Sequence, residues 1–323
     1  MRSHHSRAGV ALLLVVHLFG CTSSENDAVG DGTIGRSRAV ADYRIGDEFG
    51  KTPVTATVLA TAPSAFLRAA RATARVDRAT GFYLGKFAGA HVVATNHHVL
   101  STMSCMGRIA TFPLLDEVQL SCERVLGTWS SIDLALFQVS VGDATEAKLA
   151  EVGGNFRFYD EVRAGQSLMT IGFGVAGNDD GVMMANQDAD CRVLSKDGEY
   201  RRMADPDPTN PGWFEAWSFS HTCDVSYGDS GSAIVDRKSG LPVGILWTGR
   251  FPKQARVQSS AYLQQLLGTE QADVWTEMNY AVPATKIREH IESVILASSP
   301  ADQARVVLQA VIARPPSPDQ PLQ

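Results

Sequence analysis

Short apolar runs rich in β-branched and aromatic residues recur through the middle of the chain, and glycine, asparagine and aspartate separate them. Runs of a few such residues between turn-forming residues predict β-strands. The strands predicted in this way span residues 82–84, 90–95, 118–120, 132–139, 167–171, 233–235 and 242–247. Many short strands broken by turns are typical of β-barrels and not of a parallel sheet covered by helices, so the pattern predicts an all-β fold.

A helical period appears after Pro283, where apolar residues recur every three or four positions. The residues on the apolar face of this predicted helix are Ile287, Ile291, Val294 and Ile295. Residues 298–323 are expected to form a second short helix and then a disordered tail, because prolines crowd the last ten residues.

The N-terminal end has the pattern of an export signal. Arg2 and Arg7 precede an apolar stretch at residues 8–19 that is too short for a stable membrane span. We therefore expect residues 1–20 to be a signal peptide that is removed on export. Residues 21–50 are polar and lack an apolar period, so they predict a lipidated tether or a propeptide.

The residues Leu18-Phe19-Gly20-Cys21 resemble a bacterial lipobox. This resemblance implies that Cys21 becomes the lipidated first residue of the mature protein. Thr22 after it implies an outer-membrane lipoprotein that faces the periplasm or the cell surface. The alternative is an ordinary signal peptide with an incidental Cys21, which gives a secreted protein.

Length and charge narrow the picture further. The chain has 323 residues and a net charge of −6, and no basic stripe suggests binding to nucleic acid. The length exceeds that of one average domain, but all-β units of two barrels often reach about 200–250 residues. We therefore expect one domain at residues 51–297 with appendages at both ends.

Three short motifs carry the candidate chemistry, in the order histidine, aspartate, serine. Thr95-Asn96-His97-His98 ends one predicted strand, Asp133 lies at the mouth of another, and Ser230 lies in the run Gly228-Asp229-Ser230-Gly231-Ser232. A serine hydroxyl is a poor nucleophile at neutral pH unless an imidazole takes its proton and a carboxylate orients that imidazole. The chain supplies all three residue types.

This set of motifs resembles that of trypsin/chymotrypsin-like serine peptidases, and more closely that of their bacterial secreted branch, the glutamyl-endopeptidase-like and trypsin-2-like proteins. The likeness extends over roughly residues 50–297. It implies two six-stranded antiparallel β-barrels with a C-terminal helix. It also implies that His98 is the general base, that Asp133 orients it, and that Ser230 attacks the substrate carbonyl.

Other interpretations of the same residues are weaker. Each motif alone is also typical of a strand end or a hairpin turn, and His97 is an alternative to His98 as the base. The nucleophile elbow of α/β-hydrolases needs a glycine in place of Ser232 and a catalytic histidine after Ser230, where only His290 follows. The subtilisin order needs the acid before the histidine.

The glycine before the nucleophile predicts an oxyanion hole. Gly228 can adopt the backbone conformation in which the N–H groups of Gly228 and Ser230 point at one spot. By resemblance, substrate-binding residues are expected at Asp224, Trp247, Thr248 and Gly249. Asp224 stands at the offset before Ser230 where trypsin-like members place the acid of the specificity pocket, and a buried carboxylate there favours substrates with Lys or Arg.

Specificity and activation stay open at this stage. Leu246 stands where Glu-specific relatives place a substrate-reading histidine, which argues against acidic substrates, although His221 is an alternative contact. Basic, apolar or small, and acidic substrates therefore all remain candidates.

Trypsin-like members pair the acid before the serine, here Asp229, with a freed N-terminal amine. No Ile-Val-Gly-Gly sequence is present, and Arg44-Ile45-Gly46 is only a weak substitute for it. Because many bacterial relatives need no such pairing, the resemblance favours a chain that is competent after folding without cleavage.

Five cysteines occur, and setting Cys21 aside as the lipid site leaves an even number in an exported chain. Disulfides are therefore expected. Of the three connectivities that four cysteines allow, we favour the two local pairs, Cys105–Cys122 and Cys191–Cys223. No cysteine has the spacing of a zinc site, so no metal is expected.

Taken together, the sequence predicts a serine endopeptidase that hydrolyses peptide bonds through a His-Asp-Ser triad and an acyl-enzyme intermediate. We expect a monomer that needs no cofactor, acts on protein or peptide substrates, and touches a membrane only through its lipid anchor. The alternative function is a catalytically silent surface lipoprotein that keeps the fold as a binding module.

Overall fold

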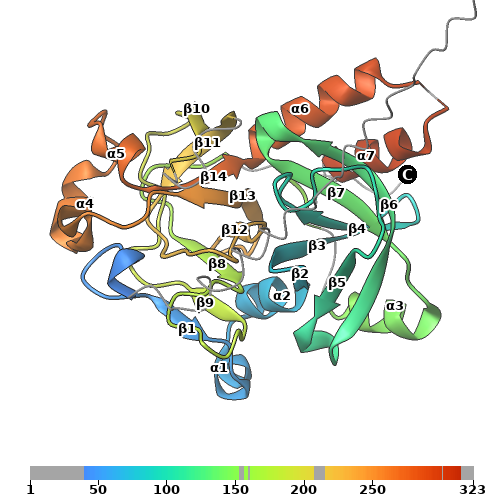
Figure 1. Ribbon diagram of the computed structural model, residues 1–323, viewed down its shortest axis with the longest axis horizontal. Helices are drawn as coiled ribbons and strands as arrows, with labels where there is room; N and C mark the ends of the chain where they lie inside the picture. The colour runs from blue at the N-terminus through green and yellow to red at the C-terminus, as the bar shows by residue number, and fades with distance from the viewer. Residues whose placement is uncertain (1–39, 153–155, 159–160, 207–214, 300, 314–323) are drawn as a thin grey trace, which may run out of the picture. The chain divides into compact units, whose positions relative to one another are not determined.

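Two antiparallel β-sheets dominate the computed structural model (Figure 1), which describes residues 40–152, 156–158, 161–206, 215–299 and 301–313. The signal peptide, Cys21, residues 21–39 of the expected tether and the proline-rich end of the chain lie outside the described residues.

The first sheet closes into a six-stranded barrel with the strand order β2-β3-β4-β7-β6-β5. Its strands are β2 (Thr73–Val76), β3 (Ala79–Phe87), β4 (Ala90–Thr95), β5 (Ile109–Phe112), β6 (Val118–Trp129) and β7 (Leu134–Val139). Every residue of β4 is buried, since β4 lies between β3 and β7 inside the closed sheet. The apolar run at residues 90–95 is therefore a central strand, as its composition predicts.

The second sheet is antiparallel and has eight strands in the order β1-β9-β8-β12-β13-β14-β11-β10. Its strands are β1 (Lys51–Pro53), β8 (Leu168–Gly172), β9 (Met184–Asn186), β10 (Arg201–Ala204), β11 (Glu215–His221), β12 (Ala233–Asp236), β13 (Pro242–Gly249) and β14 (Asn279–Pro283). The predicted all-β, chymotrypsin-like fold is thus confirmed, with one closed barrel and, in place of the second expected barrel, an eight-stranded sheet. The second sheet exceeds the six expected strands, and the short strands β1 and β10 form its two edges.

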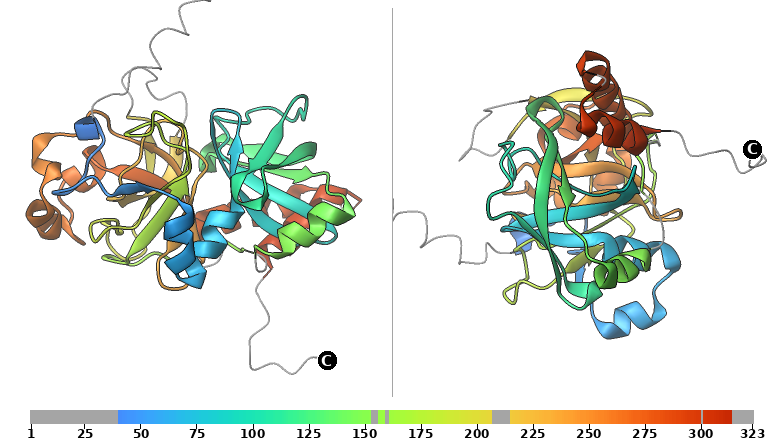
Figure 2. Two further views of the ribbon diagram at one scale, coloured as in Figure 1. Left: turned by 90° about the horizontal axis from the view of Figure 1, so that it is seen from below. Right: turned by 90° about the vertical axis from the view of Figure 1, so that its right-hand side faces the viewer.

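Seven α-helices accompany the sheets within the described residues. They are α1 (Ala56–Thr61), α2 (Ser64–Ala72), α3 (Asp143–Ala150), α4 (Ser260–Leu266), α5 (Asp273–Thr276), α6 (Ala284–Ala297) and α7 (Gln303–Ile312). The apolar face predicted after Pro283 belongs to α6, which contacts β13 and β14, whereas α7 contacts β3 of the barrel. Figure 2 shows these two C-terminal helices next to each other. No helix among the described residues is both long enough and apolar enough to cross a membrane.

The segment before β1 packs into the fold from residue 43 onward. Tyr43 and Ile45 are each only 1% exposed, and β1 pairs with β9 in register Lys51 to Asn186. Residues 40–50 therefore differ from the polar tether that the sequence predicts for this stretch. This segment is too short and too mixed in polarity to produce a period that sequence analysis can detect.

Both favoured disulfides are present. Cys105–Cys122 joins the loop after the Asn96-His97-His98 motif to strand β6, and Cys191–Cys223 joins the loop after β9 to the residue before Asp224. Such crosslinks are typical of proteins that fold in an oxidising compartment.

Candidate active site

The His98 ring contacts Asp133 as the sequence predicts. The Nδ1 atom lies 2.8 Å from Asp133 Oδ2, and the backbone N–H of His98 donates to Asp133 Oδ1 at 3.0 Å. Because a carboxylate only accepts hydrogen bonds, Nδ1 carries the proton and Nε2 is left free to accept one. Asp133 has no exposed surface, whereas 33% of the His98 side chain is exposed.

Local backbone geometry fixes this carboxylate. Asp133 follows the 3₁₀ turn Ser130–Ile132 and has a left-handed backbone with φ 34°, a conformation that aspartate tolerates better than most residues. Its carbonyl oxygen accepts a hydrogen bond from Asn96 Nδ2 at 2.8 Å. The strand end at β4 and the start of β7 are thereby held together beneath His98.

The neighbouring His97 has a different partner. Its Nδ1 atom lies 2.7 Å from Thr128 Oγ1, whose hydroxyl donates to the carbonyl of Leu100 at 2.6 Å. Burial lowers the pKa of His97 from its usual value, so its ring is neutral at physiological pH. The structure thus brings His98, and not His97, against the buried acid.

Ser230 lies in a tight loop of the second sheet, and the glycine before it has the predicted special geometry. Gly228 has φ +94°, and a Cβ atom at this position would lie 2.5 Å from the carbonyl oxygen of Phe173. Within the described residues, the N–H groups of Gly228 and Ser230 have no hydrogen-bond acceptor. Two unengaged donors on either side of Asp229 fit the expected oxyanion hole.

Thr80 of strand β3 connects the barrel to this loop. Its hydroxyl donates to the carbonyl of Gly228 at 2.7 Å, and its backbone N–H donates to the carbonyl of Ser230 at 2.9 Å. Both carbonyls are therefore engaged by Thr80 of the barrel. Thr80 has no sequence motif that marks this role.

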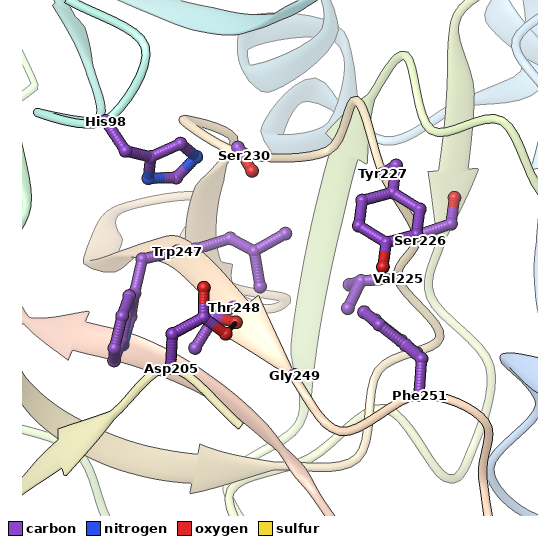
Figure 3. A pocket seen from close by; sticks show the side chains of 11 residues that line it. His98, Asp205, Val225, Ser226, Tyr227, Ser230, Trp247, Thr248, Gly249 and Phe251 are labelled. Carbon is purple, nitrogen blue, oxygen red and sulfur yellow. Dashed lines mark hydrogen bonds between the residues drawn. The ribbon is translucent and has the colours of Figure 1, made fainter. Parts of the chain in front are cut away.

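His98 and Ser230 face the same pocket, which has a volume of about 160 Å³. Figure 3 shows the Ser230 hydroxyl turned away from the His98 ring, and no hydrogen bond joins the two residues. Ser230 is partly exposed, and partly exposed side chains change rotamer on the picosecond to nanosecond scale. Catalytic hydrogen bonds are often long or misaligned before substrate binds.

A second acid lies in this pocket. Asp205 is half-buried and accepts a hydrogen bond from Thr248 Oγ1 at 2.6 Å. Burial lowers the pKa of His98, but the charge of Asp133, its hydrogen bond and the charge of Asp205 together raise that pKa above its usual value. Asp205 was not predicted from the sequence, because a single acid in a polar loop has no distinguishing pattern.

The remaining predicted substrate-binding residues divide into two groups. Trp247, Thr248 and Gly249 line the pocket, together with Leu246 and Ser230. Asp224 does not line it, and only 1% of its surface is exposed.

The structure corrects the expected orientation of Asp224. Its two carboxylate oxygens accept the backbone N–H groups of Ile45 and Gly50, each at 2.6 Å. Burial raises the pKa of Asp224 to about 7. This carboxyl therefore holds the N-terminal segment, and nothing in its geometry supports the basic specificity that the offset from Ser230 suggests.

His221 is equally unavailable to substrate. It lies in β11 with no exposed surface, and burial followed by the positive charge of Lys253 lowers its pKa to about 3. A neutral, buried ring cannot neutralise an acidic substrate side chain. In the part of the chain that the structure describes, no group of three or more His, Cys, Asp or Glu side chains is arranged to hold a metal ion.

Comparisons with solved structures give distant likenesses. The inactive mutant form of the Rv3671c protein from M. tuberculosis matches with a TM-score of 0.44 and 17% identity, over 78% of this chain and 98% of that chain. The active form of the same protease has a TM-score of 0.44 and 16% identity, over 79% of this chain and 93% of that one. An HtrA-type protease, AlgW with a tripeptide, has a TM-score of 0.43 and 15% identity, over 72% of this chain and 62% of that one.

A search of curated proteins finds no match to this chain. A family model described as a trypsin-like peptidase domain matches residues 79–245, which is more than half of the 323 residues and includes His98, Asp133 and Ser230. This chain therefore belongs to the family of trypsin-like peptidase domains.

Proposed function

We propose that this peptidase is a serine-type endopeptidase in which Ser230 is the nucleophile, His98 the general base and Asp133 the residue that orients His98. One observation carries the proposal. A fully buried carboxylate contacts both the ring and the backbone of a partly exposed histidine. That histidine shares a pocket with Ser230, whose own N–H and that of Gly228 are unengaged among the described residues. An exposed binding surface has no need of such an arrangement.

The chemistry follows from these positions. Nε2 of neutral His98 takes the proton of Ser230 Oγ as the oxygen bonds to the substrate carbonyl carbon. The same proton then passes to the leaving amine as the peptide bond breaks, which leaves an acyl group on Ser230. Water repeats the sequence: His98 accepts a water proton as the water oxygen bonds to the acyl carbon. The bond from that carbon to Ser230 Oγ then breaks, the carboxylic acid product leaves, and the proton returns to Ser230. The Asp133 carboxylate stabilises the imidazolium that forms in each half of the cycle.

The negative charge on the carbonyl oxygen needs its own donors. The N–H groups of Gly228 and Ser230 are suited to this task, since no internal acceptor competes for them among the described residues. Removing one such donor in a serine peptidase lowers kcat by about 10²–10³-fold.

We propose that the enzyme cleaves after apolar or small residues. Val225, Leu246 and Phe251 form much of the pocket wall, and all three are buried apolar side chains. Neither Asp224 nor His221 reaches the pocket lining. Asp205 is the one acid among the described residues that line it, and its carboxylate accepts a hydrogen bond from Thr248. Figure 3 shows both residues near Trp247. We propose no glutamyl specificity.

We also propose that the protein is exported and anchored by a lipid on Cys21. The two disulfides support export, because such bonds form in oxidising compartments. The anchor itself rests on the sequence motif around Cys21, which lies outside the described residues.

Replacing the nucleophile tests the mechanism. Ser230→Ala should lower peptide hydrolysis by about 10⁴-fold or more, because the attacking oxygen is gone. The melting temperature should hardly change, since the hydroxyl of Ser230 makes no hydrogen bond within the described residues. Ser232→Ala is a matched control in the same loop: its Oγ is buried, unlike that of Ser230, and likewise has no hydrogen-bond partner among the described residues. Loss of this hydroxyl should leave activity within a few-fold of wild type. Wild-type turnover by Ser230→Ala would refute the mechanism.

A further inference from the structure

We propose that Lys51 is a positioning residue for the nucleophile loop, and that its side-chain ammonium makes the site competent without a cut in the chain. The proposal rests on the proposed serine-peptidase function. It concerns residues 43–51, here called the N-terminal strap, and residues 224–230, here called the nucleophile loop.

The central contact is a buried ion pair. Lys51 Nζ lies 2.5 Å from Asp229 Oδ2, and each side chain is only 1% exposed. A buried carboxylate that loses its cation is strongly destabilised, because neither water nor another charge replaces the partner. The buried position of the Asp229 carboxylate therefore depends on Lys51.

Asp229 in turn fixes the backbone around Ser230. Its carboxylate accepts the N–H of Gly174 at 3.0 Å and the N–H of Ser226 at 2.7 Å. Its own N–H donates to the carbonyl of Ser226 at 3.0 Å. The N–H of Ser230 belongs to the peptide group that begins at Asp229, so the carboxylate anchor sets where that oxyanion donor points.

Lys51 and Asp229 pack closely against the backbone of Gly174. A Cβ atom on Gly174 would collide with Asp229 Oδ2, Lys51 Nζ and Ser226 Oγ. Glycine is therefore the residue that leaves room for these three groups.

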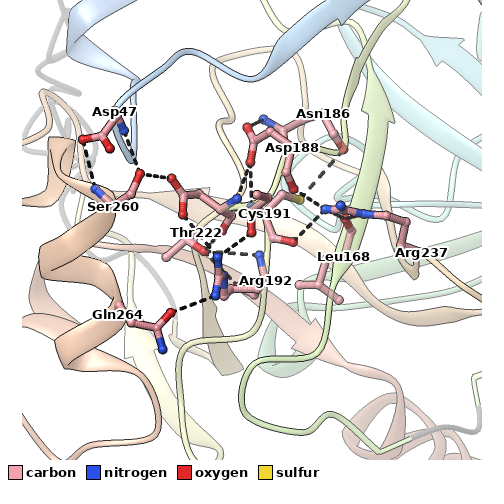
Figure 4. Close-up of polar contacts among 12 residues, drawn as sticks. Asp47, Leu168, Asn186, Asp188, Cys191, Arg192, Thr222, Arg237, Ser260 and Gln264 are labelled. Atoms are coloured by element: carbon pink, nitrogen blue, oxygen red, sulfur yellow. Dashed lines mark hydrogen bonds and ion pairs between the residues drawn. The ribbon is translucent and has the colours of Figure 1, made fainter.

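The rest of the strap holds Lys51 in place. The amides of Ile45 and Gly50 bind the two oxygens of Asp224, at the other end of the nucleophile loop. Asp47 and Ser260 exchange two hydrogen bonds, of 3.1 and 3.2 Å, as Figure 4 shows. Tyr43 packs at 5.0 Å between ring centroids against Phe251, which lines the pocket.

These contacts explain competence without cleavage. The Ile45 nitrogen in Arg44-Ile45-Gly46 is an ordinary amide bonded to Asp224, so it does not serve as a terminal amine for Asp229. Lys51 supplies the positive charge from within an unbroken chain.

The test compares Lys51→Met with wild type in the full chain, using a fluorophosphonate to count reactive sites. We expect kcat per folded molecule to fall by about 100-fold or more while KM changes only a few-fold, because the donors act mainly in the transition state. Lys86→Met is the control: that lysine pairs with Glu146 on the surface, and its loss should leave kcat unchanged.

A double variant distinguishes a loss of folding from a loss of the positioning role. Lys51→Met with Asp229→Asn removes both buried charges, so the melting temperature should recover toward wild type while kcat stays low. Recovery of wild-type kcat in the double variant would overturn the proposal, since charge balance alone would then suffice. Wild-type kcat in Lys51→Met would overturn it as well.

Two further readouts distinguish failure of the role proposed for Lys51 from failure of the proposed serine-peptidase mechanism. Activity in Ser230→Ala would refute the serine-peptidase function, whereas an inactive Ser230→Ala beside a fully active Lys51→Met would refute only the role of Lys51. Mass spectrometry of fluorophosphonate-labelled protein should find the chain continuous through residues 40–60. Label confined to molecules cut between residues 39 and 51 would overturn the claim of competence without cleavage.

Discussion

Two negative charges act on the His98 ring: Asp133 through a hydrogen bond of 2.8 Å, and Asp205 from across the pocket. His97 lies beside them and is neutral at physiological pH. His98 must be neutral to accept the serine proton, so activity is lost as pH falls through its pKa. Because the net effect of its surroundings raises that pKa, the acidic limb should lie above the usual value for histidine, about 6.5.

Asp205→Asn tests this electrostatic effect. Removing the charge makes the imidazolium less stable, so the His98 pKa should fall and the acidic limb of kcat/KM against pH should move to lower pH. The asparagine side chain still carries an oxygen that can accept from Thr248, which keeps the pocket wall intact. An acidic limb that stays in place or moves to higher pH would contradict the role assigned to Asp205.

The site residues differ in how visible they are from sequence. His98, Asp133 and Ser230 stand in short motifs. The structure brings the first two into contact, and Ser230 lies in the pocket that His98 also lines. Lys51 and Thr80 act on the nucleophile loop from more than a hundred residues away along the chain. A contact between such distant positions leaves no local pattern, and a buried lysine cannot be told from a surface lysine by its neighbours in sequence.

Among the structural elements, the docking of the N-terminal strap onto the nucleophile loop decides the role of Asp224. Asp224→Asn leaves one oxygen to accept an N–H but turns an NH₂ group toward the other, so one of the two hydrogen bonds at 2.6 Å is lost. Losing such a buried bond costs about 1–3 kcal/mol of stability.

The effect of Asp224→Asn on activity should be uniform. Because the side chain supports the loop and does not touch the pocket, cleavage after Leu or Phe should fall by the same factor as cleavage after Lys or Arg. A peptide library profile of the variant and of wild type gives the ratio directly. A selective loss of cleavage after Lys and Arg would place the carboxylate at the substrate after all.

Across the whole molecule, periodicity predicted the elements with continuous patterns. The runs at residues 90–95 and 233–235 became β4 and β12, and the apolar face after Pro283 became α6. Helices α1 to α5 were not predicted, because they are short and lie between strands. The eight-stranded second sheet was also not foreseen, since its edge strands β1 and β10 have only three and four residues.

The proposed lipid anchor concerns the molecule as a whole and its location. Cys21→Ser should release the protein from the membrane fraction, because the thioether that carries the lipid can no longer form. Cell fractionation with detection of the full chain measures the shift, and Ser24→Ala serves as a control that should stay with the membrane. If Cys21→Ser also remains membrane-bound, the lipid anchor is wrong.

The central claim is that Ser230 is a nucleophile activated by His98, and covalent labelling tests it most directly. A fluorophosphonate should modify the wild-type protein at one position, and peptide mass spectrometry should locate the adduct on Ser230. His98→Ala should slow this labelling by orders of magnitude, whereas His97→Ala should have a far smaller effect, since its ring contacts Thr128 and not Asp133. Folded wild-type protein that takes up no label at Ser230 would contradict the account and favour a noncatalytic binding module.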